Sequence, residues 1–101
     1  MNTIITDNID KIESLCRKYK VKELYVFGSV TGKKFSKKSD VDLLVNFKSI
    51  PVLDYADNYF SLLDALQKIL KRNIDLLTLK SLRNPYFIEE VNETKKKIYE
   101  A

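Results

Sequence analysis

The sequence contains no histidine, and this absence removes a large part of catalytic chemistry. Nucleophilic catalysis by Ser–His or Cys–His pairs is excluded, as is any reaction that uses imidazole as its base. The single cysteine, Cys16, excludes an internal disulfide and a zinc site with several cysteine ligands. Because Cys16 lies in the apolar stripe of a predicted helix, we expect a small core residue rather than a reactive thiol. The candidate catalytic groups that remain are carboxylates, lysines, hydroxyls and a bound metal.

Long hydrophobic runs are also missing. No apolar stretch approaches the roughly 20 residues that span a bilayer, so no association with a membrane is expected. The first segment, MNTIITDNID, contains acidic side chains and lacks the apolar region of a signal peptide. We therefore expect a cytoplasmic protein.

The charge balance is only mildly basic. The chain has 18 Lys and Arg against 14 Asp and Glu, a formal net charge of +4. This excess is too small to indicate nucleic-acid binding, and direct binding to nucleic acid is not expected. With 101 residues, 45% of them hydrophobic, the chain is predicted to form one globular domain over residues 1–101.

Hydrophobic periodicity predicts alternating helices and strands. Helices are expected over residues 7–19, from an Asp54 N-cap to about residue 70, and after an Asn84 N-cap followed by proline. Strands are expected over residues 23–27, 41–47 and 73–79, with a last edge strand at 97–100. The connection between the first two strands is too short for a crossover helix. The prediction is therefore an α/β (α+β) fold, with a mixed sheet of three or four strands and helices packed against it.

Two aspartates alternate with apolar residues in the segment SDVDLLV. On a strand, Asp40 and Asp42 would point to the same side, about 6.5 Å apart. Carboxylates this close repel each other unless a cation lies between them, and Mg²⁺ is often held by one or two carboxylates plus substrate phosphates. A D-x-D segment by itself usually has no functional role, because so short a motif often occurs by chance. Here the opposite strand face is wholly apolar, and Asp75 lies in another apolar strand, where a lone acid needs a reason.

A second candidate feature, Gly28-Ser29, directly follows the first strand. Glycine allows the backbone to approach a ligand closely, and a helical turn after it would present N–H groups to phosphate. The Ser29 hydroxyl can donate to the same phosphate. Downstream, Ser39 can cap the loop or orient Asp40. The lysines within residues 33–38 are interpreted mainly as a solvated loop, from which one can reach a triphosphate.

Gly28-Ser29, the segment from Ser39 to Val45, and Asp75 in Ile-Asp-Leu together resemble the signature of the polymerase-β nucleotidyltransferase superfamily. The short length and the helix-first order resemble its minimal nucleotidyltransferase branch, the MNT antitoxin-type domains. The resemblance covers nearly the whole chain and implies a polymerase-β-like nucleotidyltransferase fold.

The resemblance also implies roles for the site residues. Gly28 and Ser29 would hold the nucleotide phosphates, while Asp40 and Asp42 would bind two Mg²⁺ ions. Asp75 would share one metal and take the proton of the attacking hydroxyl. Many relatives carry Ala-Arg-Gly shortly after Gly-Ser, where this chain has Thr31-Gly32-Lys33. Lys33 or Lys34 is expected to replace the missing arginine as a point charge.

The function implied by the resemblance is the Mg²⁺-dependent transfer of AMP from ATP, or of another nucleotide from its NTP, to a hydroxyl of a protein. The implied partner is a HEPN-type ribonuclease toxin, with this chain as its antitoxin. Two alternatives stay open: an antitoxin that acts by contact with weak or no catalysis, and a transferase of the aminoglycoside-modifying kind. A homo-oligomer and a hetero-oligomer with the toxin also both stay open.

Overall fold

The computed structural model of the protein describes residues 3–31 and 39–101. Its elements follow the predicted alternation of helices and strands, and the expected last edge strand is confirmed. In chain order they are α1 (Thr3–Thr6), α2 (Ile9–Lys18), β1 (Val21–Phe27), the 3-10 turn η1 (Gly28–Thr31), β2 (Val41–Phe47), α3 (Val52–Leu70), β3 (Ile74–Thr78), the 3-10 turn η2 (Leu79–Ser81), α4 (Pro85–Thr94) and β4 (Lys96–Glu100). Among the described helices, none is both long and apolar enough to span a bilayer.

The four strands form one sheet in the order β3-β2-β1-β4. Strand β1 runs antiparallel to β2 and to β4, whereas β2 and β3 are parallel. The predicted mixed sheet is therefore confirmed, and β2 occupies an interior position. The parallel pair requires a long crossover, which the 19 residues of α3 provide.

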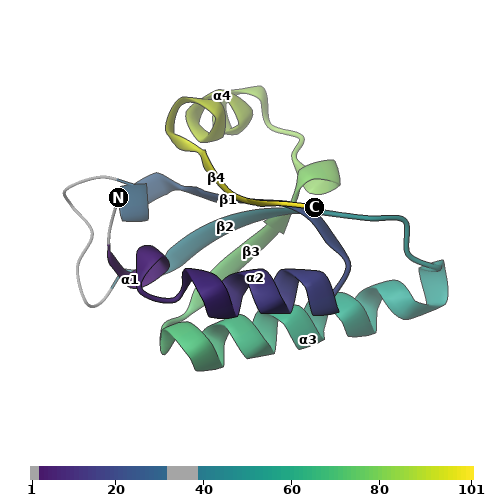
Figure 1. The fold of residues 1–101 in the computed structure, drawn as a ribbon. Coiled ribbons are helices and arrows are strands. Elements are labelled where there is room, and N and C mark those ends of the chain that lie inside the picture. Colours follow the sequence, from purple (N-terminus) through teal and green to yellow (C-terminus); the bar gives the residue numbers. More distant parts are fainter. Residues whose placement is uncertain (1–2, 32–38) are drawn as a thin grey trace.

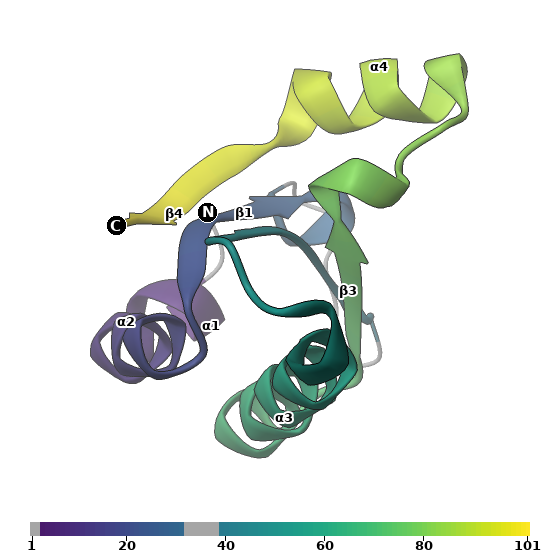
Figure 2. The ribbon, with the colours of Figure 1, turned by 90° about the vertical axis from the view of Figure 1, so that its right-hand side faces the viewer.

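Helices cover both faces of the sheet. Figure 1 shows α1, α2 and α3 on one side and α4 on the other, and Figure 2 shows the same layers from the side on which α3 begins. The larger core lies between the sheet and the first three helices, and includes Ile12 and Cys16 of α2, Val26 of β1, Leu43 of β2, and Leu62 and Leu66 of α3. A smaller cluster of Phe27, Leu44 and Val91 joins α4 to the opposite face. Because Asp42 alternates with Val41 and Leu43, it lies on the α4 face.

Cys16 is fully buried in the larger core. Burial raises the pKa of its thiol to about 12, with Glu13 adding to the effect. The thiol therefore stays protonated near neutral pH, and the prediction of a core residue is confirmed.

Some predicted helix boundaries are wrong. The expected helix 7–19 is present as α2 but begins only at Ile9, and a separate short helix, α1, precedes it over Thr3–Thr6. Between the two helices, the Asn8 side-chain amide donates to the Ile4 carbonyl at 2.8 Å. Asp54 is not an N-cap, since α3 begins at Val52 with Pro51 in the N-cap position. Proline is tolerated only at a helix start, so it fixes this boundary, and Asp54 lies in the first turn.

The predicted Asn84 cap is confirmed, and it generates a stability prediction. The Asn84 side chain accepts hydrogen bonds from the backbone N–H groups of Tyr86 at 2.9 Å and Phe87 at 3.4 Å. Asn84→Ala should lower the free energy of unfolding by about 1 kcal/mol, as measured by urea denaturation. The matched control is Asn92→Ala, in the same helix at an exposed interior position, where alanine should be neutral or stabilising. Equal losses in both variants would contradict a capping role.

Candidate active site

Two of the predicted site aspartates are neighbours across the parallel strands. Asp42 of β2 pairs in register with Asp75 of β3. Residues paired in this way point to the same face of a sheet, and adjacent strands lie about 4.8 Å apart. The structure therefore brings the isolated acid of the third strand beside the second aspartate of the D-x-D segment, although 33 positions separate them in the sequence.

Asp40 lies immediately before β2, with an exposed side chain. The backbone around it is held by the segment that leads into β3. Val41 donates its N–H to the Asn73 carbonyl at 3.0 Å, and the Arg72 guanidinium donates to the Ser39 carbonyl at 2.7 Å. Ser39 thus helps to position the entry to β2 through its main chain, and a nucleotide contact from its side chain stays a prediction.

The half-buried carboxyl of Asp42 is the electrostatic centre of this group. Burial, followed by the negative charges of Asp75, Asp40 and Glu90, raises the pKa of Asp42 to about 6. All four influences disfavour the ionised form. Glu90, on α4, adds a fourth carboxylate that the sequence reasoning missed, because its proximity to Asp42 depends on how α4 packs on the sheet.

Gly28 is required where it stands. It has a φ of +71°, and an added Cβ would lie 2.5 Å from Oδ2 of Asp42. A side chain at this position would be strained by its backbone and would collide with the carboxylate. The backbone of the glycine turn therefore packs directly against the acidic group.

The predicted helical turn after Gly28 is present as η1. The Thr31 hydroxyl closes this turn by donating to the Gly28 carbonyl at 2.7 Å. Ser29 lies in η1, but its side chain is outside the part that the structure describes. Lys33 lies wholly outside the described residues, as does Lys34.

Thr94, at the end of α4, is a further residue that the sequence reasoning missed. Its hydroxyl oxygen accepts the Gly28 N–H at 3.1 Å, and its own proton is donated to the Glu90 carbonyl at 3.2 Å. A segment 66 residues away in the sequence therefore holds the glycine turn. No local pattern predicts this contact, because it depends on how α4 packs on η1.

Tyr59 borders the other side of the group. Its hydroxyl donates to the Leu76 carbonyl at 2.5 Å, next to Asp75 in β3. Burial, together with the negative charge of Asp75, raises the pKa of the Tyr59 hydroxyl. The phenol therefore stays neutral near neutral pH and marks the boundary between α3 and the site.

The donor set fits a hard divalent cation. Carboxylate oxygens are the ligands that Mg²⁺ prefers, and the mutual repulsion around Asp42 is of the kind that a cation relieves. Within residues 3–31 and 39–101, no three carboxylate or thiol side chains lie close enough to enclose an ion by themselves. Proteins usually hold Mg²⁺ through one or two carboxylates together with substrate phosphates and water.

The chain is similar in sequence and in structure to proteins described as nucleotidyltransferases and adenylyltransferases. A Methanocaldococcus jannaschii protein with the provisional name protein adenylyltransferase MJ0128 is 36% identical over 96 residues, covering 92% of this chain and 95% of the relative. A solved structure with the provisional description minimal nucleotidyltransferase superposes with a TM-score of 0.76 at 27% identity, covering 95% of each chain.

A third similarity is to a chain in the complex of tri-AMPylated Shewanella oneidensis HEPN toxin with MNT antitoxin. It has a TM-score of 0.64 at 22% identity, and it covers 95% of this chain and 72% of that one. This likeness shows a shared fold. The family model described as polymerase beta, nucleotidyltransferase matches residues 10–101, nearly the whole sequence. The chain therefore belongs to the polymerase-β nucleotidyltransferase family.

Proposed function

We propose that this nucleotidyltransferase transfers AMP from ATP to a hydroxyl group of a protein partner in a Mg²⁺-dependent reaction. The observation that carries the proposal is the placement of Asp42 between Asp75 and the Gly28 turn, where the pKa of its carboxyl is raised to about 6. The provisional name of the archaeal relative, a protein adenylyltransferase, supports a protein as the acceptor.

The glycine turn is assigned to the phosphates of the nucleotide. Gly28 has no side chain to keep a phosphate away, and it is the first residue of η1. Because Thr94 already accepts the Gly28 N–H, other donors of Gly28-Ser29 and the basic loop must supply the phosphate contacts. Lys33 remains the candidate for the charge that arginine supplies in many relatives.

The three aspartates are assigned to two Mg²⁺ ions. Asp40, Asp42 and Asp75 would hold them, with Asp42 as the central ligand because it is flanked by the other two. When bound, the ions would stabilise the attacking and leaving oxygens of an in-line displacement. Ionised Asp42 suits this role, since its half-buried carboxylate gains most from a neighbouring positive charge.

Asp75 is assigned to the acceptor hydroxyl. It is exposed on β3, an edge strand of the sheet, so another protein can reach it. As the acceptor oxygen bonds to the α-phosphorus, Asp75 takes the hydroxyl proton. The bond from the α-phosphorus to the bridging oxygen breaks, and pyrophosphate leaves. We further propose a HEPN-type toxin as the acceptor, which would make this chain an antitoxin.

The direct test uses ATP labelled on its α-phosphate, Mg²⁺ and the product of the adjacent gene as candidate acceptor. We expect the wild type to label the acceptor. Asp42→Asn should lower the labelling rate at least about a hundredfold, because losing a metal ligand costs more than losing a residue that only supports a ligand. Asp10→Asn, an exposed aspartate on α2, is the matched control and should be fully active. If the wild type leaves the acceptor unlabelled and the Asp42→Asn variant still neutralises the toxin, the chain is an antitoxin that acts by contact.

The raised pKa of Asp42 predicts a specific pH dependence of stability. The pKa is about 6 in the folded protein against an ordinary value of 3.8, so the folded state binds more protons between these values. The free energy of unfolding should therefore fall as pH rises through this window. Asp42→Asn should remove that fall and be more stable than the wild type near neutral pH, by on the order of 1 kcal/mol after solvent screening. Urea denaturation across the window checks this, and parallel pH curves for the two proteins would refute it.

Thr94 is predicted to support nucleotide binding through Gly28. Thr94→Val keeps the shape but removes the oxygen that accepts the Gly28 N–H. Loss of this hydrogen bond should weaken binding of a fluorescent ATP analogue about tenfold and shift the Gly28 amide resonance. Thr94→Ser retains the acceptor and should restore both. Unchanged affinity in Thr94→Val would show that the contact has no role in nucleotide binding.

A further inference from the structure

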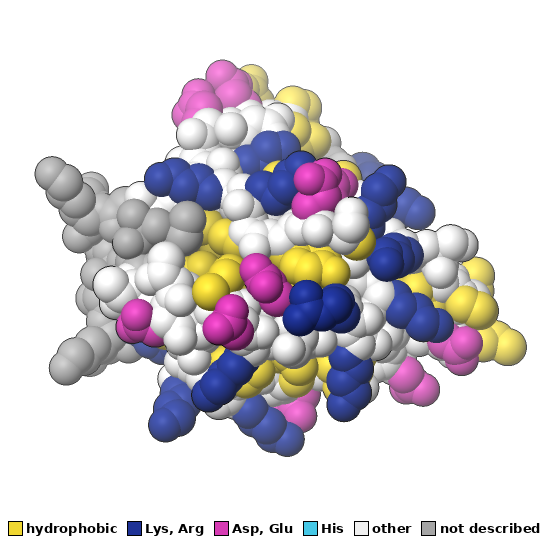
Figure 3. All heavy atoms as spheres, in the orientation of Figure 1, with side chains coloured by type: hydrophobic (Ala, Val, Ile, Leu, Met, Phe, Trp, Pro, Cys, Tyr) yellow, Lys and Arg dark blue, Asp and Glu magenta, His cyan; other side chains and the backbone are white. Residues whose placement is uncertain are grey.

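The first turn of α3 carries the most exposed large hydrophobic side chains among the described residues. Val52 is 89% exposed and Leu53 is 93% exposed, and Asp54 follows them. We call these three residues the α3 tip. Figure 3 shows hydrophobic and acidic side chains side by side where α3 begins. Single exposed apolar residues are ordinary, but two neighbours presented almost completely to solvent indicate a contact surface.

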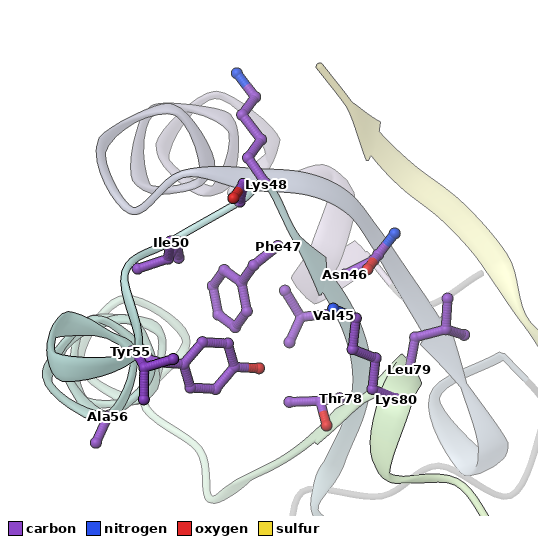
Figure 4. A pocket seen from close by; sticks show the side chains of 12 residues that line it. Val45, Asn46, Phe47, Lys48, Ile50, Tyr55, Ala56, Thr78, Leu79 and Lys80 are labelled. Atoms are coloured by element: carbon purple, nitrogen blue, oxygen red, sulfur yellow. The ribbon is translucent and has the colours of Figure 1, made fainter.

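A groove lies directly beside this tip, between the start of α3, the end of β2 and η2. We call it the end groove, and it has a volume of about 580 Å³. Its lining includes Phe47, Lys48, Val52, Tyr55, Leu79 and Lys80. In Figure 4 the rings of Phe47 and Tyr55 lie side by side in the groove, where they pack edge to face with their centroids 5.5 Å apart. The end groove thus offers apolar surface that no described part of the chain fills.

The charges of the end groove and the α3 tip are opposite. The groove lining contains Lys48 and Lys80 and no carboxylate, and neither ammonium forms an ion pair with a described residue. The α3 tip presents two apolar side chains followed by the carboxylate of Asp54. A basic apolar groove and an acidic apolar projection therefore lie next to each other at one end of the molecule.

We propose that a second copy of this chain occupies the end groove, forming a symmetric dimer in which each α3 tip inserts into the groove of its partner. Because Val52 belongs to the tip and also lines the groove, a twofold axis at this point brings both contacts together reciprocally. Leu53 is buried against the apolar floor, and Asp54 meets Lys48 and Lys80. Phe47 and Asp42 lie at opposite ends of β2, five residues or about 16 Å apart, so the dimer leaves the nucleotidyltransferase site open.

Sedimentation of the chain without nucleotide or acceptor tests this inference separately from the proposed reaction. We expect a dimer at high protein concentration that dissociates on dilution. Leu53→Ser should raise the dissociation constant at least about a hundredfold, because a leucine is lost from both reciprocal contacts. Tyr86→Ser, which removes an 83% exposed side chain on α4, is the matched control and should leave the dimer unchanged.

Charge reversal gives a sharper test of the partner. Lys48→Glu/Lys80→Glu and Asp54→Lys should each be monomeric alone, since like charges then meet at both contacts. An equimolar mixture should form a heterodimer, because both contacts again join opposite charges. Lys11→Glu/Lys22→Glu changes the net charge equally at exposed positions outside the groove and should stay dimeric.

Three outcomes would overturn the proposal. If the wild type is monomeric even at millimolar concentration, a second copy does not occupy the end groove. A dimer that survives Leu53→Ser uses a different surface. Charge-reversed variants that fail to associate when mixed show that the α3 tip and the end groove do not meet.

Discussion

The parallel, in-register pairing of β2 with β3 is the constraint on which the site depends. It sets Asp42 beside Asp75 on one face of the sheet, although two ionised carboxylates at that spacing repel each other. The opposite face of the same strands is anchored by Val41, Leu43 and Leu76, which are buried in the larger core. Burial of the apolar face fixes the register of the two strands, and this register holds the two aspartates next to each other.

The layer formed by α4 completes what the sheet alone cannot hold. Gly28 has a left-handed backbone packed against the carboxyl of Asp42, and the hydroxyl of Thr94 holds its N–H in place. The same helix adds the negative charge of Glu90 to the group around Asp42. The helix both holds the glycine turn and adds to the negative charge around Asp42, so its packing bears on the proposed chemistry as well as on stability.

Local chemistry explains which parts of this molecule could be predicted from the sequence. Alternation around Asp42, the cap at Asn84 and the break at Gly28 follow from rules that span a few residues, and all three features are present. Resemblance to a family supplied the link from Asp42 to Asp75, which periodicity cannot provide. Thr94 and Glu90 were missed because their contacts depend on tertiary packing. The start of α3 was misplaced because Pro51, rather than an acidic side chain, sets it.

Under the proposed function, folding and cation binding would be coupled through Asp42. A half-buried carboxyl surrounded by other acids is least stable when ionised, which is also the state that would bind the proposed metal. Any cation that binds the folded group, and not the unfolded chain, therefore recovers stability that the site's own charges remove. The repulsion that lowers the stability of the fold would also favour the proposed cation, so one cluster of charges would set both the stability and the cation affinity.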